Sequence, residues 1–145
     1  MVGEGRGFWW YNRQTPFMEK KFDRWNLEKK NFHNRRSVPY CHPRELWWCA
    51  LGVNIGFEQD GTGELFDHPV IILKVLSAQT CLVVPLTKSI HQQPLRTPVG
   101  LVEGKEARAV ISQMRVVDTK RLIRKIGFLE IEQFEHIRKT VKDML

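Results

Sequence analysis

Two neighbouring apolar segments constrain the fold of this chain more than any other feature. They are HPVIILKVL, residues 68–76, and TCLVVPLT, residues 80–87, and both are rich in valine, isoleucine and leucine. Apolar runs of this length and composition favour buried strands. Only Ser77, Ala78 and Gln79 separate them. The sequence therefore predicts two buried strands joined by a tight turn.

Further short strands are predicted on both sides of this pair. The segments are ELWWCAL before it and VGLV, ARAVIS and QMRVVD after it. RLIRKIGFL, residues 121–129, fits either a helical turn followed by a strand or a single edge strand. Many short strands with turns between them are typical of a small, strongly bent sheet or barrel.

The chain ends in a predicted helix over residues 130–145. Phe134, Ile137, Val141 and Met144 have the spacing of one helical face. Acidic residues occupy the first half of the segment and basic residues the second, which suits the helix dipole. The fold class that follows is mainly β with helices.

Another helix is predicted ahead of the strands, over residues 17–36. Met18, Phe22, Trp25 and Phe32 fall on one apolar stripe, with lysine and arginine around it. Such a stripe must pack, either on the domain or on a partner. Whether the first 17 residues are native stays open, because Met18 could be the natural start.

Positive charge is concentrated at the N-terminal end. Residues 1–44 hold 10 Lys/Arg and 4 Asp/Glu, whereas residues 45–145 hold 13 and 12. We therefore divide the chain into a basic helical arm with its linker, 1–43, and a domain, 44–145. The arm indicates either a polyanionic or acidic protein partner or simply a solvated helix face.

The cysteines and the hydropathy favour a cytoplasmic protein. Cys41, Cys49 and Cys81 are irregularly spaced and do not form a disulfide framework. Cys41-His42 followed by Cys49 is a poor match to a zinc site, so no metal is expected. No apolar run approaches the roughly 20 residues that cross a bilayer, so no membrane association is expected.

Four short motifs occur in order in the strand-rich domain. They are G-x-E-Q-x-G at 56–61, P-V at 69–70, P-L-T at 85–87 and Q-x-R-x-x-D at 113–118. This order resembles the MazF/PemK family of toxin endoribonucleases. The resemblance covers residues 44–145 and leaves the basic arm outside.

The resemblance implies an SH3-like β-barrel with a C-terminal helix, here with an N-terminal helical extension, that acts as a homodimer. It implies the toxin of a type II toxin–antitoxin system, which cuts single-stranded RNA at short sequences without metal or cofactor. In that reaction the ribose 2′-OH attacks the adjacent phosphorus and leaves a 2′,3′-cyclic phosphate and a 5′-OH. A cognate antitoxin with a disordered acidic tail would cover the RNA groove.

The resemblance also implies which residues are catalytic. The family uses a threonine at the end of the second strand, which corresponds to Thr87, and an arginine before the P-V strand, where this chain has His68. His68 could transfer protons near neutral pH, or it could impair the nuclease by replacing arginine. Each residue also has an alternative without a catalytic role. His68 could be a hydrogen-bonded surface histidine, and Thr87 could simply be a β-branched residue of a strand.

Five further residues are candidate RNA contacts under this resemblance. Phe57 could stack on a base or plug the core, and Glu58 and Gln59 could bind base edges or cap their loop. Gln113 and Arg115 lie two apart in a predicted strand, so their side chains would share one face. Gln113 matches a family position near the RNA, and Arg115 could bind a phosphate or an internal carboxylate such as Asp118.

A non-catalytic function stays open beside the nuclease. Related CcdB-type toxins share the fold and bind DNA gyrase, and a fold alone does not determine function. The arm could also make this an RNA- or partner-binding module. The sequence that would be cut and the identity of the antitoxin cannot be read from this chain.

Overall fold

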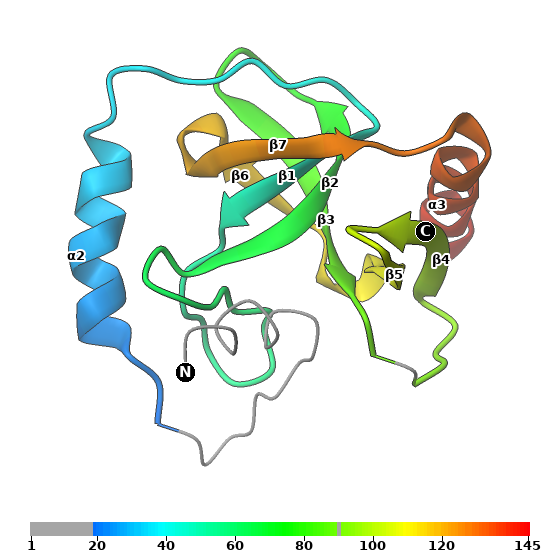
Figure 1. Ribbon diagram of the computed structural model, residues 1–145, viewed down its shortest axis with the longest axis horizontal. Coiled ribbons are helices and arrows are strands. Elements are labelled where there is room, and N and C mark those ends of the chain that lie inside the picture. The colour runs from blue at the N-terminus through cyan, green and yellow to red at the C-terminus, as the bar shows by residue number, and fades with distance from the viewer. Residues whose placement is uncertain (1–18, 90) are drawn as a thin grey trace.

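The computed structural model describes residues 19–89 and 91–145. The possible leader and the predicted helical positions up to Met18 lie outside the described residues. One curled β-sheet occupies the middle of the molecule, and its two long helices lie at opposite sides of it (Figure 1). No helix within the described residues is long and apolar enough to cross a membrane.

Seven strands form the sheet, and the paired strands are all antiparallel. They are β1 (Glu45–Ala50), β2 (Asp67–Val75), β3 (Thr80–Thr87), β4 (Arg96–Val102), β5 (Lys105–Val110), β6 (Arg115–Asp118) and β7 (Leu122–Phe128). Their spatial order is β4-β5-β3-β2-β1-β7, and β6 pairs with β3. The sheet curls into a half-barrel, which confirms the predicted mainly β fold.

The predicted pair of buried strands is confirmed as the β2–β3 hairpin. Its register pairs Val70 with Pro85 and Ile72 with Val83, and backbone bonds to Thr80 close the turn. β3 is also the strand at which the sheet divides. Its first half pairs with β6 and its last two residues pair with β5, so the strand bends between two groups of neighbours.

Alternate side chains along the strands pack into two hydrophobic cores on opposite faces of the sheet. In β1, Trp48 joins one cluster with Ile71 and Leu86, whereas Trp47 joins another with Val70. The second cluster also contains three buried free cysteines.

The C-terminal helix α3 (Ile131–Met144) covers the first core. Phe134 and Ile137 are buried in that core, and Val141 packs against it. The helix has Glu132 in its first turn and Lys142 in its last, as the helix dipole prefers. The predicted C-terminal helix is therefore confirmed, with its apolar face turned to the sheet.

The N-terminal helix α2 (Phe22–His33) is shorter than the predicted 17–36, and the predicted stripe is partly wrong. Phe22 is 48% exposed, whereas Trp25 is buried against Ala50 and Phe66. Gly52 permits this packing, because a Cβ at Gly52 would lie 2.2 Å from the Trp25 ring. The arm therefore docks on its own domain, with the Trp25 side chain buried at the contact.

Two short 3₁₀ helices refine the strand predictions. η1 (Ile111–Gln113) covers the end of the predicted strand ARAVIS and the first residue of the predicted strand QMRVVD, so the second strand is reduced to Arg115–Asp118, as β6. η2 (Thr119–Arg121) precedes β7. Only Arg121 of the ambiguous segment 121–129 belongs to η2, and residues 122–128 form one strand at the edge of the sheet, which is the second of the two predicted alternatives.

Candidate functional site

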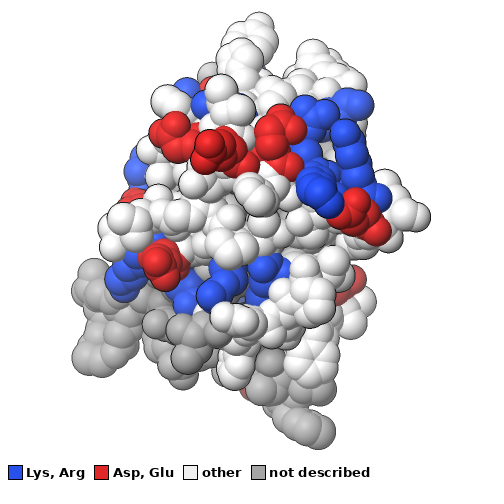
Figure 2. Space-filling view, turned by 90° about the vertical axis from the view of Figure 1, so that its right-hand side faces the viewer, with Lys and Arg blue, Asp and Glu red and all other residues white. Residues whose placement is uncertain are grey.

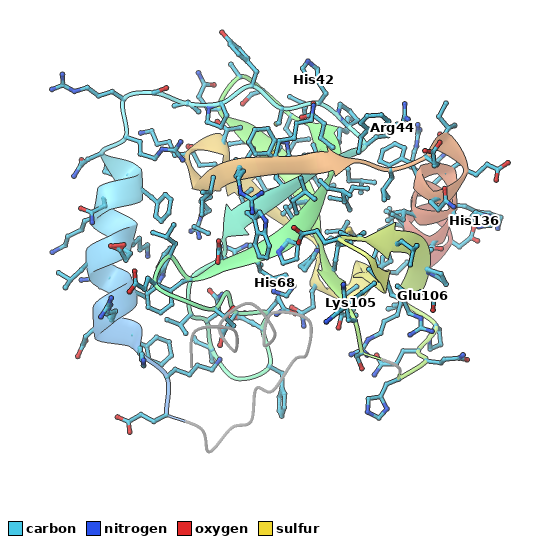
Figure 3. All side chains as sticks on the ribbon, in the orientation of Figure 1. His42, Arg44, His68, Lys105, Glu106 and His136 are labelled. Atoms are coloured by element: carbon cyan, nitrogen blue, oxygen red, sulfur yellow. The ribbon has the colours of Figure 1, made fainter. Side chains whose placement is uncertain are left out.

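The β2–β3 hairpin brings the two predicted catalytic residues together. The paired part of the hairpin ends with Val70 opposite Pro85, and the same register extended by two residues would place His68 opposite Thr87 on one face. The His68 Nε2 lies 2.6 Å from the carbonyl oxygen of Leu86. Figure 3 shows His68 near the middle of the molecule, between the two long helices.

Both side chains are buried. His68 is 2% exposed and Thr87 is 3% exposed. Burial lowers the pKa of His68 to about 4, and the hydrogen bond to the Leu86 carbonyl opposes this only in part. The ring is therefore neutral at pH 7. Because Nε2–H donates to that carbonyl, Nδ1 carries the basic lone pair.

Arg108 is a neighbour of Thr87 that the sequence analysis missed. The β3–β5 register sets Arg108 directly opposite Thr87, so both side chains extend from the same face. The Arg108 guanidinium donates to the Ser89 carbonyl at 2.8 Å, and the Ser89 N–H donates to Thr87 Oγ1 at 3.1 Å. His68, Thr87 and Arg108 thus occupy one row across β2, β3 and β5.

No sequence signal pointed to Arg108, because it lies inside the unremarkable strand segment ARAVIS. Lys88, which directly follows Thr87, was also missed. Burial lowers the pKa of Lys88 to about 8, and nearby Lys105 adds to the effect. Its ammonium donates to the Val102 carbonyl at 3.0 Å, which ties the end of β3 to the β4–β5 hairpin.

The β1–β2 loop, residues 51–66, contains three of the candidate RNA contacts and is held from two directions. On one side, Gln113 Oε1 accepts from the Gln59 N–H at 3.1 Å, and Gln113 Nε2 donates to the Phe57 carbonyl at 3.1 Å. Gln113 is therefore a structural support of this loop.

Lys20 from the arm holds the other side of the β1–β2 loop. Its Nζ donates to the carbonyl oxygens of Asn54 at 2.5 Å and Gly56 at 2.8 Å, and forms an ion pair with Asp60 at 3.0 Å. The Lys20 side chain is only 8% exposed. Three oxygens thus surround one ammonium group, so the arm and the loop form one unit.

The three loop residues have different environments. Phe57 is 60% exposed, so the interpretation that it plugs the core is wrong. Glu58 Oε1 accepts from the Ile55 N–H at 3.0 Å, which is the predicted capping alternative. The Gln59 amide is buried and donates to the Asp60 carbonyl at 2.9 Å.

The prediction that Gln113 and Arg115 share one strand face is wrong. Gln113 ends η1 and points to the β1–β2 loop, whereas Arg115 begins β6 and pairs with Val83. The intervening 3₁₀ turn breaks the two-residue alternation on which the prediction depended. Among the described residues, no three His, Cys, Asp or Glu side chains come together in an arrangement that could hold a metal ion.

Solved structures with a similar fold include several toxins. MazF (Form-I) from Deinococcus radiodurans is 16% identical, with a TM-score of 0.57, and the match covers 74% of this chain and 96% of that chain. A MazE-MazF structure (Form-II) from the same organism is 14% identical, with a TM-score of 0.53 and coverage of 74% and 95%. An endoribonuclease in complex with its cognate antitoxin, from a mycobacterial species, is 12% identical, with a TM-score of 0.57 and coverage of 72% and 93%.

A search of curated proteins found no match. The sequence profile described as PemK-like, MazF-like toxin of type II toxin-antitoxin system matches residues 42–145. That range contains the whole sheet, the row of His68, Thr87 and Arg108, and α3, and it leaves α2 outside. The chain therefore belongs to the PemK-like, MazF-like family of type II toxin–antitoxin toxins.

Proposed function

We propose that this protein is a metal-independent endoribonuclease that cuts single-stranded RNA at short sequences. In this reaction the ribose 2′-OH attacks the adjacent phosphorus, loses its proton to a base and forms a 2′,3′-cyclic phosphate. The bond from phosphorus to the 5′-oxygen breaks, and the departing 5′-oxygen takes a proton from water to leave as a 5′-OH. The observation that carries the proposal is the row of a base, a hydroxyl and a guanidinium at the end of the β2–β3 hairpin, in a chain of this toxin family.

Each member of the row has a chemical role in the proposal. His68 Nδ1 accepts the 2′-OH proton, because Nε2–H is already engaged with the Leu86 carbonyl. The Thr87 hydroxyl donates to a phosphate oxygen. The Arg108 guanidinium stabilises the negative charge that develops on phosphorus, which is the task that an arginine at position 68 would otherwise perform.

The burial of His68 adds a condition to this mechanism. A ring that is 2% exposed cannot reach a 2′-OH, so RNA binding must uncover it. Uncovering the ring would raise its pKa from about 4 toward the ordinary value of 6.5. The cleavage rate should therefore rise between pH 4 and about 6.5 and level off above that range. An identical pH profile in His68→Gln would remove His68 from proton transfer.

The test is cleavage by the purified full chain of a mixed-sequence single-stranded RNA in EDTA. Fragments should end in a cyclic phosphate and begin with a 5′-OH. Thr87→Val keeps the shape of the side chain but removes the hydroxyl, and should slow cleavage about 10²–10³-fold. Thr87→Ser is the matched control and should retain most of the rate.

Substitutions of His68 and Arg108 test the remaining roles. Arg108→Lys keeps a charge but loses the planar guanidinium, and should slow cleavage at least tenfold. His68→Arg decides between the two interpretations of His68: a faster enzyme means that the histidine impairs the reaction, and a slower one means that it takes part. Absence of cleavage at any sequence, in wild type and His68→Arg alike, would refute the nuclease.

A second candidate function is a toxin that acts by binding a protein target, as CcdB-type toxins bind gyrase. The burial of both His68 and Thr87 favours it, because neither reaches solvent in this structure. Co-purification with gyrase, together with no RNA binding and no cleavage, would select this candidate over the nuclease.

We also propose a homodimer and a cognate antitoxin with an acidic tail. Support comes from family membership and from the similar fold of the two toxin–antitoxin structures described above. Size-exclusion chromatography with light scattering tests the dimer. Co-expression with the neighbouring small open reading frame tests the antitoxin, which should copurify and suppress RNA cleavage.

A further inference from the structure

A cavity of about 410 Å³ lies between the second half of α2 and the segment that contains η2. One wall comes from the arm, outside the range of the toxin family profile, and the other comes from the toxin domain. The cavity therefore exists only because α2 docks on the sheet. We call it the arm cavity.

The arm cavity combines aromatic and cationic side chains. Trp25 and Phe32 line it, with ring centroids 6.3 Å apart, and the Arg121 guanidinium lies 5.7 Å from the Trp25 ring. The cationic side chains in its lining are Lys29, Lys30, Lys120 and Arg121. A single carboxylate, Asp118, also lines it, and that carboxylate accepts from the Lys120 N–H at 2.8 Å.

The C-terminus of α2 borders the cavity, and its carbonyl groups oppose an anion. One of them is already compensated, because Lys120 Nζ donates to the His33 carbonyl at 2.9 Å. Arg35 fixes the two walls together by donating to the Lys120 and Leu122 carbonyls at 2.6 and 2.8 Å. Four cations against one carboxylate leave the cavity positive.

The face around α3 differs from the arm cavity in its charge. Figure 2 shows the face around α3, where acidic and basic side chains lie close together. The sequence of α3 itself holds three acidic and three basic residues. Charge complementarity therefore points to the arm cavity as a site for an anionic ligand that also has an apolar, planar part.

We propose that the arm cavity binds one nucleotide of a single-stranded RNA, away from the bond that is cut. The base packs against Phe32, and the flanking phosphates contact Lys29 and Lys30. This inference rests on RNA as the proposed substrate. The cavity lies close to the candidate site, because Arg121 donates to the Ala50 carbonyl at 3.0 Å and the preceding residue, Cys49, pairs with His68.

Fluorescence anisotropy of a labelled 2′-O-methyl single-stranded RNA of about ten nucleotides tests the site without cleavage. Lys29→Glu/Lys30→Glu in the full chain should weaken binding at least tenfold and reduce the slope of log Kd against log salt by about 1.4. Lys21→Glu/Arg24→Glu makes the same charge change outside the cavity and should weaken binding less than threefold.

Phe32→Ala tests the base contact separately and should weaken binding at least fivefold with an unchanged salt slope. Circular dichroism checks that each variant remains folded, and Lys29→Gln/Lys30→Gln replaces Lys29→Glu/Lys30→Glu if the charge reversal unfolds the protein. Equal losses in the Lys29/Lys30 variant and its control would overturn the proposal.

An acidic peptide is the competing ligand. If a labelled glutamate-rich peptide binds through Lys29 and Lys30 and the RNA does not, the cavity is a peptide site and the proposal fails. A different result would refute the proposed nuclease function. In that case wild type would bind the 2′-O-methyl RNA through the arm cavity but would not cleave ordinary RNA. Binding and cleavage are thus separate readouts.

Discussion

The buried imidazole of His68 should make the stability of this protein strongly pH-dependent. Burial lowers the folded-state pKa of His68 to about 4, against 6.5 for an unperturbed histidine. As the pH falls, the unfolded chain therefore binds the proton first. The contribution of His68 to the free energy of unfolding is fully present above pH 6.5 and is lost as the pH falls from 6.5 through 4.

The size of this effect follows from the difference between the two pKa values. At about 1.4 kcal/mol for each pKa unit, the full loss is roughly 3 kcal/mol, and about 2 kcal/mol of it is lost by pH 5. Since small domains are stable by only about 5–15 kcal/mol, such a loss is easily measured.

Urea unfolding at pH 7 and pH 5 measures the loss in wild type and in His68→Gln. Glutamine retains a donor for the Leu86 carbonyl but does not titrate. Wild type should lose about 2 kcal/mol more than His68→Gln between the two pH values. His136→Gln removes an exposed histidine and should behave as wild type. Equal losses in wild type and His68→Gln would refute the assignment of a buried, neutral ring.

Three further substitutions test the packing of the arm and the edge of the sheet. Gly52→Ala places a Cβ 2.2 Å from the Trp25 ring at a φ of +78°, so it should displace the arm at a cost of about 1–3 kcal/mol, seen as a red shift of tryptophan fluorescence. An unchanged spectrum would contradict this. Lys20→Met leaves Asp60 without its ion pair and should lower the free energy of unfolding by roughly 3 kcal/mol, with faster hydrogen exchange in the β1–β2 loop. Exchange as slow as in wild type would show that the loop does not depend on the arm. Burial alone would raise the pKa of Glu45, but hydrogen bonds from neighbouring side chains outweigh it and lower the pKa to about 2. The stabilisation from Glu45 is therefore present above pH 4.5 and lost as the pH falls through 2. Glu45→Gln should lower the free energy of unfolding, measured with urea at pH 7, by about 2 kcal/mol. The same substitution should remove the part of the acid dependence that comes from Glu45.

Much of the fold could be predicted from the sequence because local patterns report local structure. The apolar runs predicted β2 and β3 to within a residue, and the spacing of Phe134 and Ile137 predicted α3. The errors occurred where another interaction overrode the pattern. The first residue of QMRVVD, Gln113, ends a 3₁₀ helix and bonds to the β1–β2 loop, which a two-residue alternation cannot anticipate.

The candidate site was predicted only in part. The family resemblance pointed to His68 and Thr87, and their positions at the ends of two joined strands bring them together. Arg108 could not be found in the same way. It meets Thr87 only because β3 leaves β6 halfway along its length and pairs with β5, a choice that depends on how the whole sheet curls.

The sequence by itself determined the strands, the C-terminal helix and the excess of positive charge in the arm, since each depends on residues close together in the chain. Only the tertiary structure decided that His68 is buried and neutral, that Lys20 is inserted among three loop oxygens, and that α2 forms a basic cavity with η2. The physical reason is that burial, pKa and charge clustering depend on neighbours tens of residues away in the chain, which no local pattern contains.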